Sequence, residues 1–123
     1  MVGSPAYVAP EVLLGNYSEK VDIWSAGILL HALLVSVLPF QGDTLDSVFE
    51  AIKNVDLDFE NGAWRSISQP ARDLVARMLA RDVSARLSAD EVLSKHSVFS
   101  ILFLNYLRLH VTIEISSYRK HCG

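Results

Sequence analysis

Cysteine is nearly missing from this 123-residue chain, and the single one, Cys122, cannot form an internal disulfide. A lone cysteine is typical of a reducing compartment, so a cytoplasmic location is our default expectation. The four histidines are scattered and lack the spacing of a metal site. We therefore expect no metal ligand among them.

A surplus of either charge is also missing. Eleven basic and fourteen acidic residues give a formal net charge of -3, and no basic stripe is present, which argues against nucleic acid as a partner. The first residues lack the basic and apolar regions of a secretory signal peptide. In the most apolar segment, residues 19–36, Glu19, Lys20 and Asp22 shorten the apolar run below the about 20 residues that a membrane span needs.

Hydrophobic residues make up half of the chain, which is enough for the core of one domain or less. Their spacing predicts a mainly α fold with about five helices. We expect these helices over residues 10–14, over 19–36, up to Asn54, from Ser68 onward, and from a capping box at Ser88 and Glu91 to about Ser94. Residues 55–67 resemble a loop with extended character.

Two of these helices differ in their apolar pattern. The helix over 19–36 is apolar on nearly every face, which predicts a buried central core helix. In the helix that ends near Asn54, capped by Thr44 or Asp43, apolar residues form a one-sided stripe that should face inward. The stripe consists of Leu45, Val48, Phe49 and Ile52.

Four short motifs occur in a fixed order along the chain. They are Gly3-Ser4-Pro5-Ala6-Tyr7-Val8-Ala9-Pro10-Glu11, Asp22-Ile23-Trp24-Ser25-Ala26-Gly27, Leu38-Pro39-Phe40 and Arg81-Asp82-Val83-Ser84-Ala85-Arg86-Leu87-Ser88. The series resembles the C-terminal lobe of eukaryotic serine/threonine protein kinases from the end of the activation segment onward. Within this family, the residues of the four motifs most resemble those of the plant calcium-dependent kinase and phosphoenolpyruvate carboxylase kinase group. The resemblance predicts a truncated kinase lobe over residues 1–96 that starts inside a larger domain.

The resemblance implies a substrate-binding loop formed by Gly3, Ser4, Pro5, Ala6 and Tyr7. In a complete kinase the Ser4 hydroxyl would bridge the catalytic Asp and Lys; a phosphorylation site is the alternative. The resemblance also implies a buried pair of Glu11 with Arg86, whereas the alternative is two separate surface charges.

Further structural roles are implied within the second motif. In the family, the residue at the position of Asp22 holds the catalytic loop, which is missing here. Asp22 is then either buried without a partner or in a region that is open to water. The alternative is an ordinary exposed Asp on a helix. We expect Trp24 to fill the core and Gly27 to permit close helix approach. Ala32 stands where basophilic relatives have Glu, so a basic substrate motif is not supported on that side.

Ser36 stands where the family commonly has Gly, at the point where the chain leaves the helix. If this position has positive φ, Ser36 costs about 1 kcal/mol.

The motifs for nucleotide chemistry are missing from these 123 residues: the Gly-rich loop, the Val-Ala-Ile-Lys lysine, His-Arg-Asp and Asp-Phe-Gly. We therefore expect no catalytic residue and no cofactor site here, because ATP and Mg belong to the complete domain. The chain is interpreted as an inactive fragment of a kinase whose partners are a protein substrate or a regulatory protein. A non-catalytic binding module and a mispredicted fragment that never folds are the alternatives.

Residues 97–123 fall outside the resemblance and form a divergent apolar tail whose apolar residues follow no clear period. We expect this tail to derive from a retained intron or an alternative exon. A genuine family-specific helix is the alternative, and weak interfacial membrane binding stays open.

Overall fold

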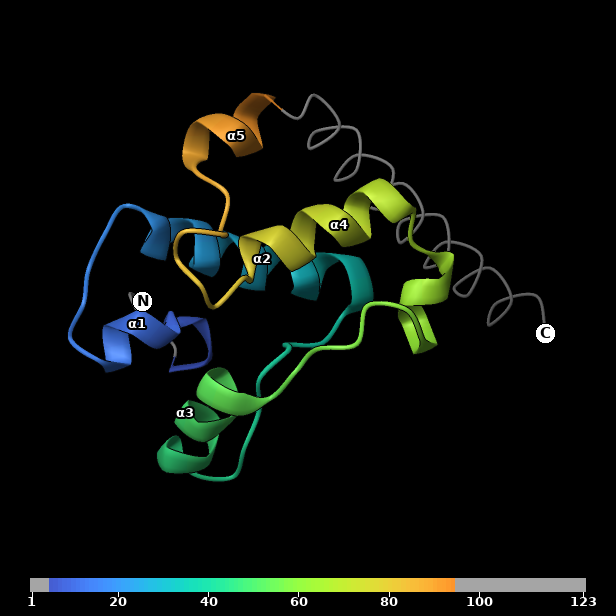
Figure 1. The fold of residues 1–123 in the computed structure, drawn as a ribbon. Helices are drawn as coiled ribbons and strands as arrows, with labels where there is room; N and C mark the ends of the chain where they lie inside the picture. The colour runs from blue at the N-terminus through green and yellow to red at the C-terminus, as the bar shows by residue number, and fades with distance from the viewer. Residues whose placement is uncertain (1–4, 95–123) are drawn as a thin grey trace, which may run out of the picture.

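The computed structural model describes residues 5–94, which form five α-helices and two short 3₁₀ helices, with no strand in that range (Figure 1). The elements are η1 (Pro5–Tyr7), α1 (Pro10–Leu13), α2 (Lys20–Val35), α3 (Leu45–Asn54), η2 (Gly62–Ser66), α4 (Gln69–Met78) and α5 (Ala89–Ser94). The mainly α fold and the five helices are confirmed. The sequence pattern missed η2, and the predicted features of Gly3, Ser4 and residues 97–123 lie outside the described residues.

The centre of the fold is the crossing of α2 and α4 (Figure 1). Gly27 lies at this crossing, where an added Cβ would come within 2.9 Å of Leu79 Cδ2 and 3.0 Å of Met78 Cβ. Any larger residue would therefore push the two helices apart. The core built around the crossing contains Trp24, Ile28, Phe40, Ile52, Leu74, Val75 and Leu87, all at most 2% exposed.

One face of α2 is open, so the prediction of a helix buried on every side is wrong. Asp22, Ala26, Leu29 and Leu33 follow one another at helical spacing, and all four are exposed. Leu29 and Leu33 are 51% and 43% exposed. An all-round apolar composition shows that a helix can be buried on every face, but the neighbouring elements decide which faces are covered.

The α3 helix begins with a capping box, and Thr44 rather than Asp43 is its N-cap. Thr44 Oγ1 accepts from Ser47 N at 3.1 Å, while Ser47 Oγ accepts from Thr44 N at 3.0 Å. Ile52 is fully buried, but Leu45 at the start of the apolar stripe is 54% exposed. The stripe therefore faces inward only toward the C-terminal end of the helix.

The C-terminal end of α2 and the start of α5 are fixed by hydrogen bonds between residues close in the sequence. Ser36 has φ 65° and ψ 17°, the left-handed conformation in which glycine is favoured, and its N donates to Ala32 O at 2.8 Å. At α5, Glu91 N donates to Ser88 Oγ at 3.2 Å and Ser88 N donates to Glu91 Oε1 at 3.0 Å, which confirms the predicted capping box.

Candidate functional site

The structure brings together Glu11 and Arg86, two residues 75 positions apart in the sequence. Arg86 Nη1 donates to Glu11 Oε2 at 2.5 Å, and Nη2 donates to Oε1 at 2.8 Å. The Arg86 side chain is 0% exposed and the Glu11 side chain 9%. This two-point geometry in a buried position holds the first turn of α1 at a fixed distance and angle from the turn that carries Arg86.

Arg86 also connects to two further segments. Its Nε donates to Ala80 O at 2.8 Å, and its Nη1 donates to Lys20 O at 3.0 Å at the start of α2. Its guanidinium carbon lies 5.0 Å from the centre of the Trp24 ring, which stacks on Phe40 at 5.7 Å. One buried cation thus joins α1, α2 and the segment after α4.

The turn that delivers Arg86 depends on Asp82, which the sequence reasoning did not single out. Asp82 Oδ1 accepts from Ser84 N at 3.0 Å and from Ser84 Oγ at 2.7 Å, and Asp82 O accepts from Arg86 N at 3.0 Å. These side-chain and backbone hydrogen bonds from Ser84 hold the pKa of the exposed Asp82 carboxyl below its ordinary value. The Asp-x-Ser spacing was the available signal, because such side chains cap their own turn.

The electrostatics of the Glu11 carboxylate reflect two opposing effects. Burial raises the pKa of Glu11, but the hydrogen bonds and the charge of Arg86, with a backbone hydrogen bond, outweigh burial and leave the pKa below its ordinary value of 4.5. The carboxylate therefore stays ionised against Arg86 at neutral pH.

The described part of the predicted substrate-binding loop rests on α2. Ser25 Oγ donates to Tyr7 O at 2.9 Å, Ala6 is buried and Tyr7 is half-buried. Sequence reasoning missed Ser25, although it lies one residue after Trp24 in the second motif. A hydroxyl there ties the loop backbone to the core helix, so loop position follows α2.

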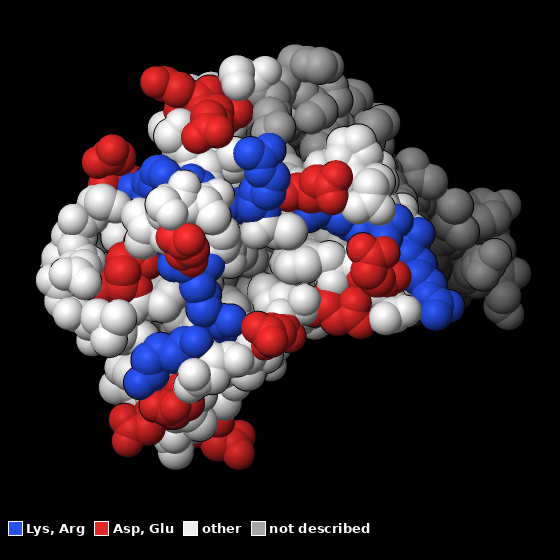
Figure 2. Space-filling model, viewed as in Figure 1, with Lys and Arg blue, Asp and Glu red and all other residues white. Residues whose placement is uncertain are grey.

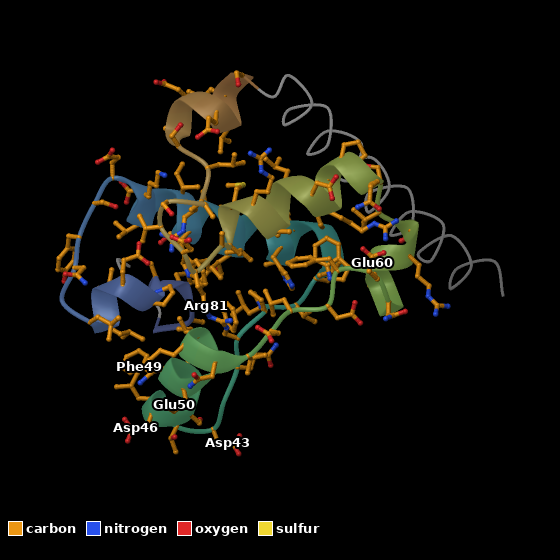
Figure 3. All side chains as sticks on the ribbon, in the orientation of Figure 1. Asp43, Asp46, Phe49, Glu50, Glu60 and Arg81 are labelled. Carbon is orange, nitrogen blue, oxygen red and sulfur yellow. The ribbon has the colours of Figure 1, made fainter. Side chains whose placement is uncertain are left out.

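Arg81 is a second cation that connects distant segments, and sequence reasoning missed it. Its side chain caps the C-terminal end of α3. Its Nε donates to Ile52 O at 2.8 Å, and Nη2 donates to Ala51 O at 3.4 Å and to Val55 O. Its Nη1 pairs with Asp56 at 3.3 Å. A cation beside the last carbonyl groups of a helix satisfies acceptors that have no partner within the helix, and it interacts favourably with the negative end of the helix dipole (Figure 3).

The remaining predicted site residue, Asp22, lies exposed in the first turn of α2, so within the described residues it is not buried without a partner. Residues 5–94 contain no group of three or more His, Cys, Asp or Glu side chains that could hold a metal. No helix in that range is long and apolar enough to cross a membrane.

Charged side chains of both signs alternate over most of the visible face (Figure 2). Acidic groups gather over α3, where Asp43, Asp46 and Glu50 are exposed (Figure 3). This view shows no continuous basic surface of the kind that phosphate backbones require.

The described residues form a helical scaffold in which one buried Arg–carboxylate pair joins α1, the start of α2 and the turn after α4. The protein kinase domain profile matches residues 1–99, and the chain belongs to the protein kinase family. Residues 5–94 thus form part of a kinase C-terminal lobe.

The particular relatives are plant serine/threonine kinases. The chain is 72% identical over 93 residues to serine/threonine-protein kinase PEPKR2 of Arabidopsis thaliana, with 76% of this chain and 20% of that protein covered. It is 53% identical over 96 residues to calcium-dependent protein kinase 33 of the same plant, with 78% of this chain and 18% of that protein covered. The chain therefore spans about a fifth of the length of these relatives.

Proposed function

We propose that this chain is the substrate-side scaffold of a serine/threonine protein kinase, whose reaction is transfer of the ATP γ-phosphoryl group to a protein Ser or Thr. The single observation that carries this proposal is the buried Glu11–Arg86 pair at 2.5 and 2.8 Å. Positioning groups matter in phosphoryl transfer because catalysis there is almost entirely alignment plus electrostatic stabilisation. A scaffold that holds the loop rigid therefore supports the reaction without touching the phosphate.

The position of the loop supports this function. Ser25 Oγ holds the backbone of Tyr7, and Glu11 lies four residues later, so two independent anchors flank residues 8–10. In the proposed kinase, residues 3–7 contact the protein substrate. We also propose a cytoplasmic location and a protein substrate or regulator as the partner.

We infer that residues 1–123 alone transfer no phosphate, since they carry none of the motifs that bind the nucleotide and Mg or supply the catalytic base. Incubation of the purified chain with labelled ATP and a generic protein substrate such as casein is expected to give no labelled product. Labelled product that disappears in the Arg86→Met variant would contradict this inference.

A chimera tests the scaffold role directly. The matched 93 residues of the Arabidopsis relative PEPKR2 are replaced by the corresponding residues of this chain. The chimera is expected to retain the phosphate transfer of its parent, measured with labelled ATP, because the segment supplies an intact pair and loop anchor.

Matched variants of the chimera sharpen the result. Glu11→Gln and Arg86→Met are expected to reduce transfer strongly, whereas Arg65→Met, at an exposed position on η2, leaves it unchanged. An inactive chimera that folds as its parent does would count against the scaffold role.

A non-catalytic binding module is the second candidate, and the open α2 face favours it. Leu29 on this face is 51% exposed. Exposed apolar surface along one helix face is typical of sites that meet another polypeptide. Capture of a casein substrate by the immobilised chain without ATP, lost in Leu29→Lys, would support this candidate over the first.

A further inference from the structure

A cavity of about 350 Å³ lies between the C-terminal turn of α2 and η2. Its walls are formed by His31, Val35, Leu38, Leu57, Ala63 and Trp64. The cavity is at the end of α2 opposite to Lys20, whose carbonyl accepts from Arg86, so it is separate from the Glu11–Arg86 site. No Asp, Glu, Lys or Arg side chain lines it.

Among the side chains that line this wall, His31 is the one that can accept a hydrogen bond through nitrogen. The residue is 5% exposed, and its Nδ1 lies 2.8 Å from Val37 O. Because a carbonyl only accepts, Nδ1 carries the hydrogen. Burial lowers the pKa of His31, although the Val37 hydrogen bond opposes this, so the ring is neutral near pH 7 and Nε2 keeps its lone pair.

Within residues 5–94, His31 Nε2 has no hydrogen-bond partner. In the same range Trp24 Nε1 is the side-chain polar atom sealed from solvent without a partner, so His31 Nε2 keeps contact with solvent, and His31 is one of the residues that line the cavity. Because the rest of the His31 residue is buried, a hydrogen-bond donor on a ligand could reach this acceptor and complete the hydrogen bonding of the ring.

The aromatic side of the cavity is built from rings that pack against one another. The His31 and Trp64 rings meet edge to face with centroids 5.1 Å apart, and Phe59 meets Trp64 in the same way at 5.1 Å. Val37, which also lines the cavity, is 53% exposed and leaves it open to solvent. A preformed wall loses little conformational freedom when a ring enters it.

We propose that this cavity binds a small neutral aromatic group with one hydrogen-bond donor, a phenol or an indole, which donates to His31 Nε2. The size fits, because an apolar cavity of about 150 Å³ already holds benzene in another protein. The apolar walls disfavour burial of a charged group, and the His31 acceptor favours a ligand with a hydrogen-bond donor. This site does not depend on the proposed kinase function.

Nuclear magnetic resonance of the ¹⁵N-labelled 123-residue chain tests the proposal with p-cresol and toluene as probes. The chain has two tryptophans, so the Trp64 indole N–H reports on the cavity while the core Trp24 indole N–H serves as an internal reference. The Trp64 signal is expected to shift saturably, with p-cresol about fivefold tighter than toluene because only p-cresol donates a hydrogen bond. No saturable shift, or equal affinity for the two probes, would overturn the proposal.

Two variants separate filling of the cavity from the hydrogen bond. Ala63→Leu, at an exposed wall position, fills the cavity and is expected to abolish the shift with both probes, whereas Ala85→Leu, an exposed alanine in the turn before Arg86, leaves binding unchanged. His31→Phe is expected to remove the preference for p-cresol over toluene. Undiminished p-cresol binding in Ala63→Leu would overturn the proposed location.

The phenol can belong to a free small molecule or to a tyrosine of a partner. The peptide Gly-Tyr-Gly, titrated in the same way, distinguishes the two sources. Tighter binding of p-cresol supports a small-molecule ligand, and tighter binding of the peptide supports a partner side chain. Failure of both to shift the Trp64 signal overturns the site.

Discussion

Arg86 has lost all contact with water, and four protein hydrogen bonds with a ring contact replace its hydration. Burial of two charges is costly, and the net stabilisation by such a pair can be close to zero even with excellent geometry. The pair with Glu11 therefore fixes the relative position of the segments that it joins more than it adds to the free energy of unfolding. Its role is to allow only one arrangement of α1 against the start of α2.

Loss of one partner should be far more harmful than loss of both. We expect Arg86→Met and Glu11→Leu each to lower the free energy of unfolding by about 3–5 kcal/mol, because the remaining group is left buried and unpaired. The double variant Glu11→Leu with Arg86→Met should recover a large part of this loss. Urea unfolding of the four proteins measures the cycle, and additive effects would contradict the buried pair.

The buried His31 predicts a pH dependence at the residue scale. Its pKa is lowered from 6.5, so below pH 6.5 the unfolded chain binds more protons than the folded one, and stability falls as the pH decreases. Urea midpoints from pH 7.5 to 5.5 should decline in the wild-type chain and decline less in His31→Phe. Equal slopes would rule out His31 as the cause.

Glu11 extends the pH dependence of stability to lower pH, because its pKa is also lowered, from 4.5. Its contribution is present above pH 4.5 and is lost as the pH falls toward the folded pKa. The two windows therefore follow one another, His31 first.

At the scale of the element, the end of α2 carries avoidable strain. Ser36 has φ 65°, and glycine adopts this conformation without the penalty that a Cβ brings. Ser36→Gly should raise the free energy of unfolding by up to about 1 kcal/mol, measured by urea unfolding. Ala26→Gly, in the middle of the same helix, is the control and should lower it by about 1 kcal/mol.

The end of α3 depends on a side chain from a distant turn. Arg81 donates to the carbonyl groups of Ala51, Ile52 and Val55. Arg81→Met should lower the free energy of unfolding by about 1–3 kcal/mol and speed hydrogen exchange in α3, because charged hydrogen bonds to these acceptors are lost. Arg65→Met, on the exposed surface of η2, should change stability by less than about 0.5 kcal/mol.

At the scale of the whole molecule, the open α2 face is expected to control self-association of the chain in solution. Leu29 contributes apolar surface that residues 5–94 do not cover. Leu29→Lys should leave the free energy of unfolding within about 0.5 kcal/mol of the wild-type value and reduce self-association in light scattering. Ile28→Lys, at the neighbouring position with 0% exposure, should instead unfold the chain.

Much of the fold was predictable from the sequence because its signals are local. The capping boxes, the start of α4 at Ser68 and the break after α2 depend on hydrogen bonds within about four residues. The order of the four motifs also predicted the protein kinase family, which residues 1–99 match. These features require no knowledge of which elements meet.

Other features could not be predicted because they depend on contacts between distant segments. The covered face of α2, the exposure of Leu45 and the cap that Arg81 places on α3 follow from which neighbours arrive. The cavity beside His31 arises where α2 and η2 meet. The sequence by itself thus determined the five α-helices, their locally capped ends and the family, whereas only the tertiary structure decided which surfaces are buried, since burial is a property of pairs of elements brought together by folding.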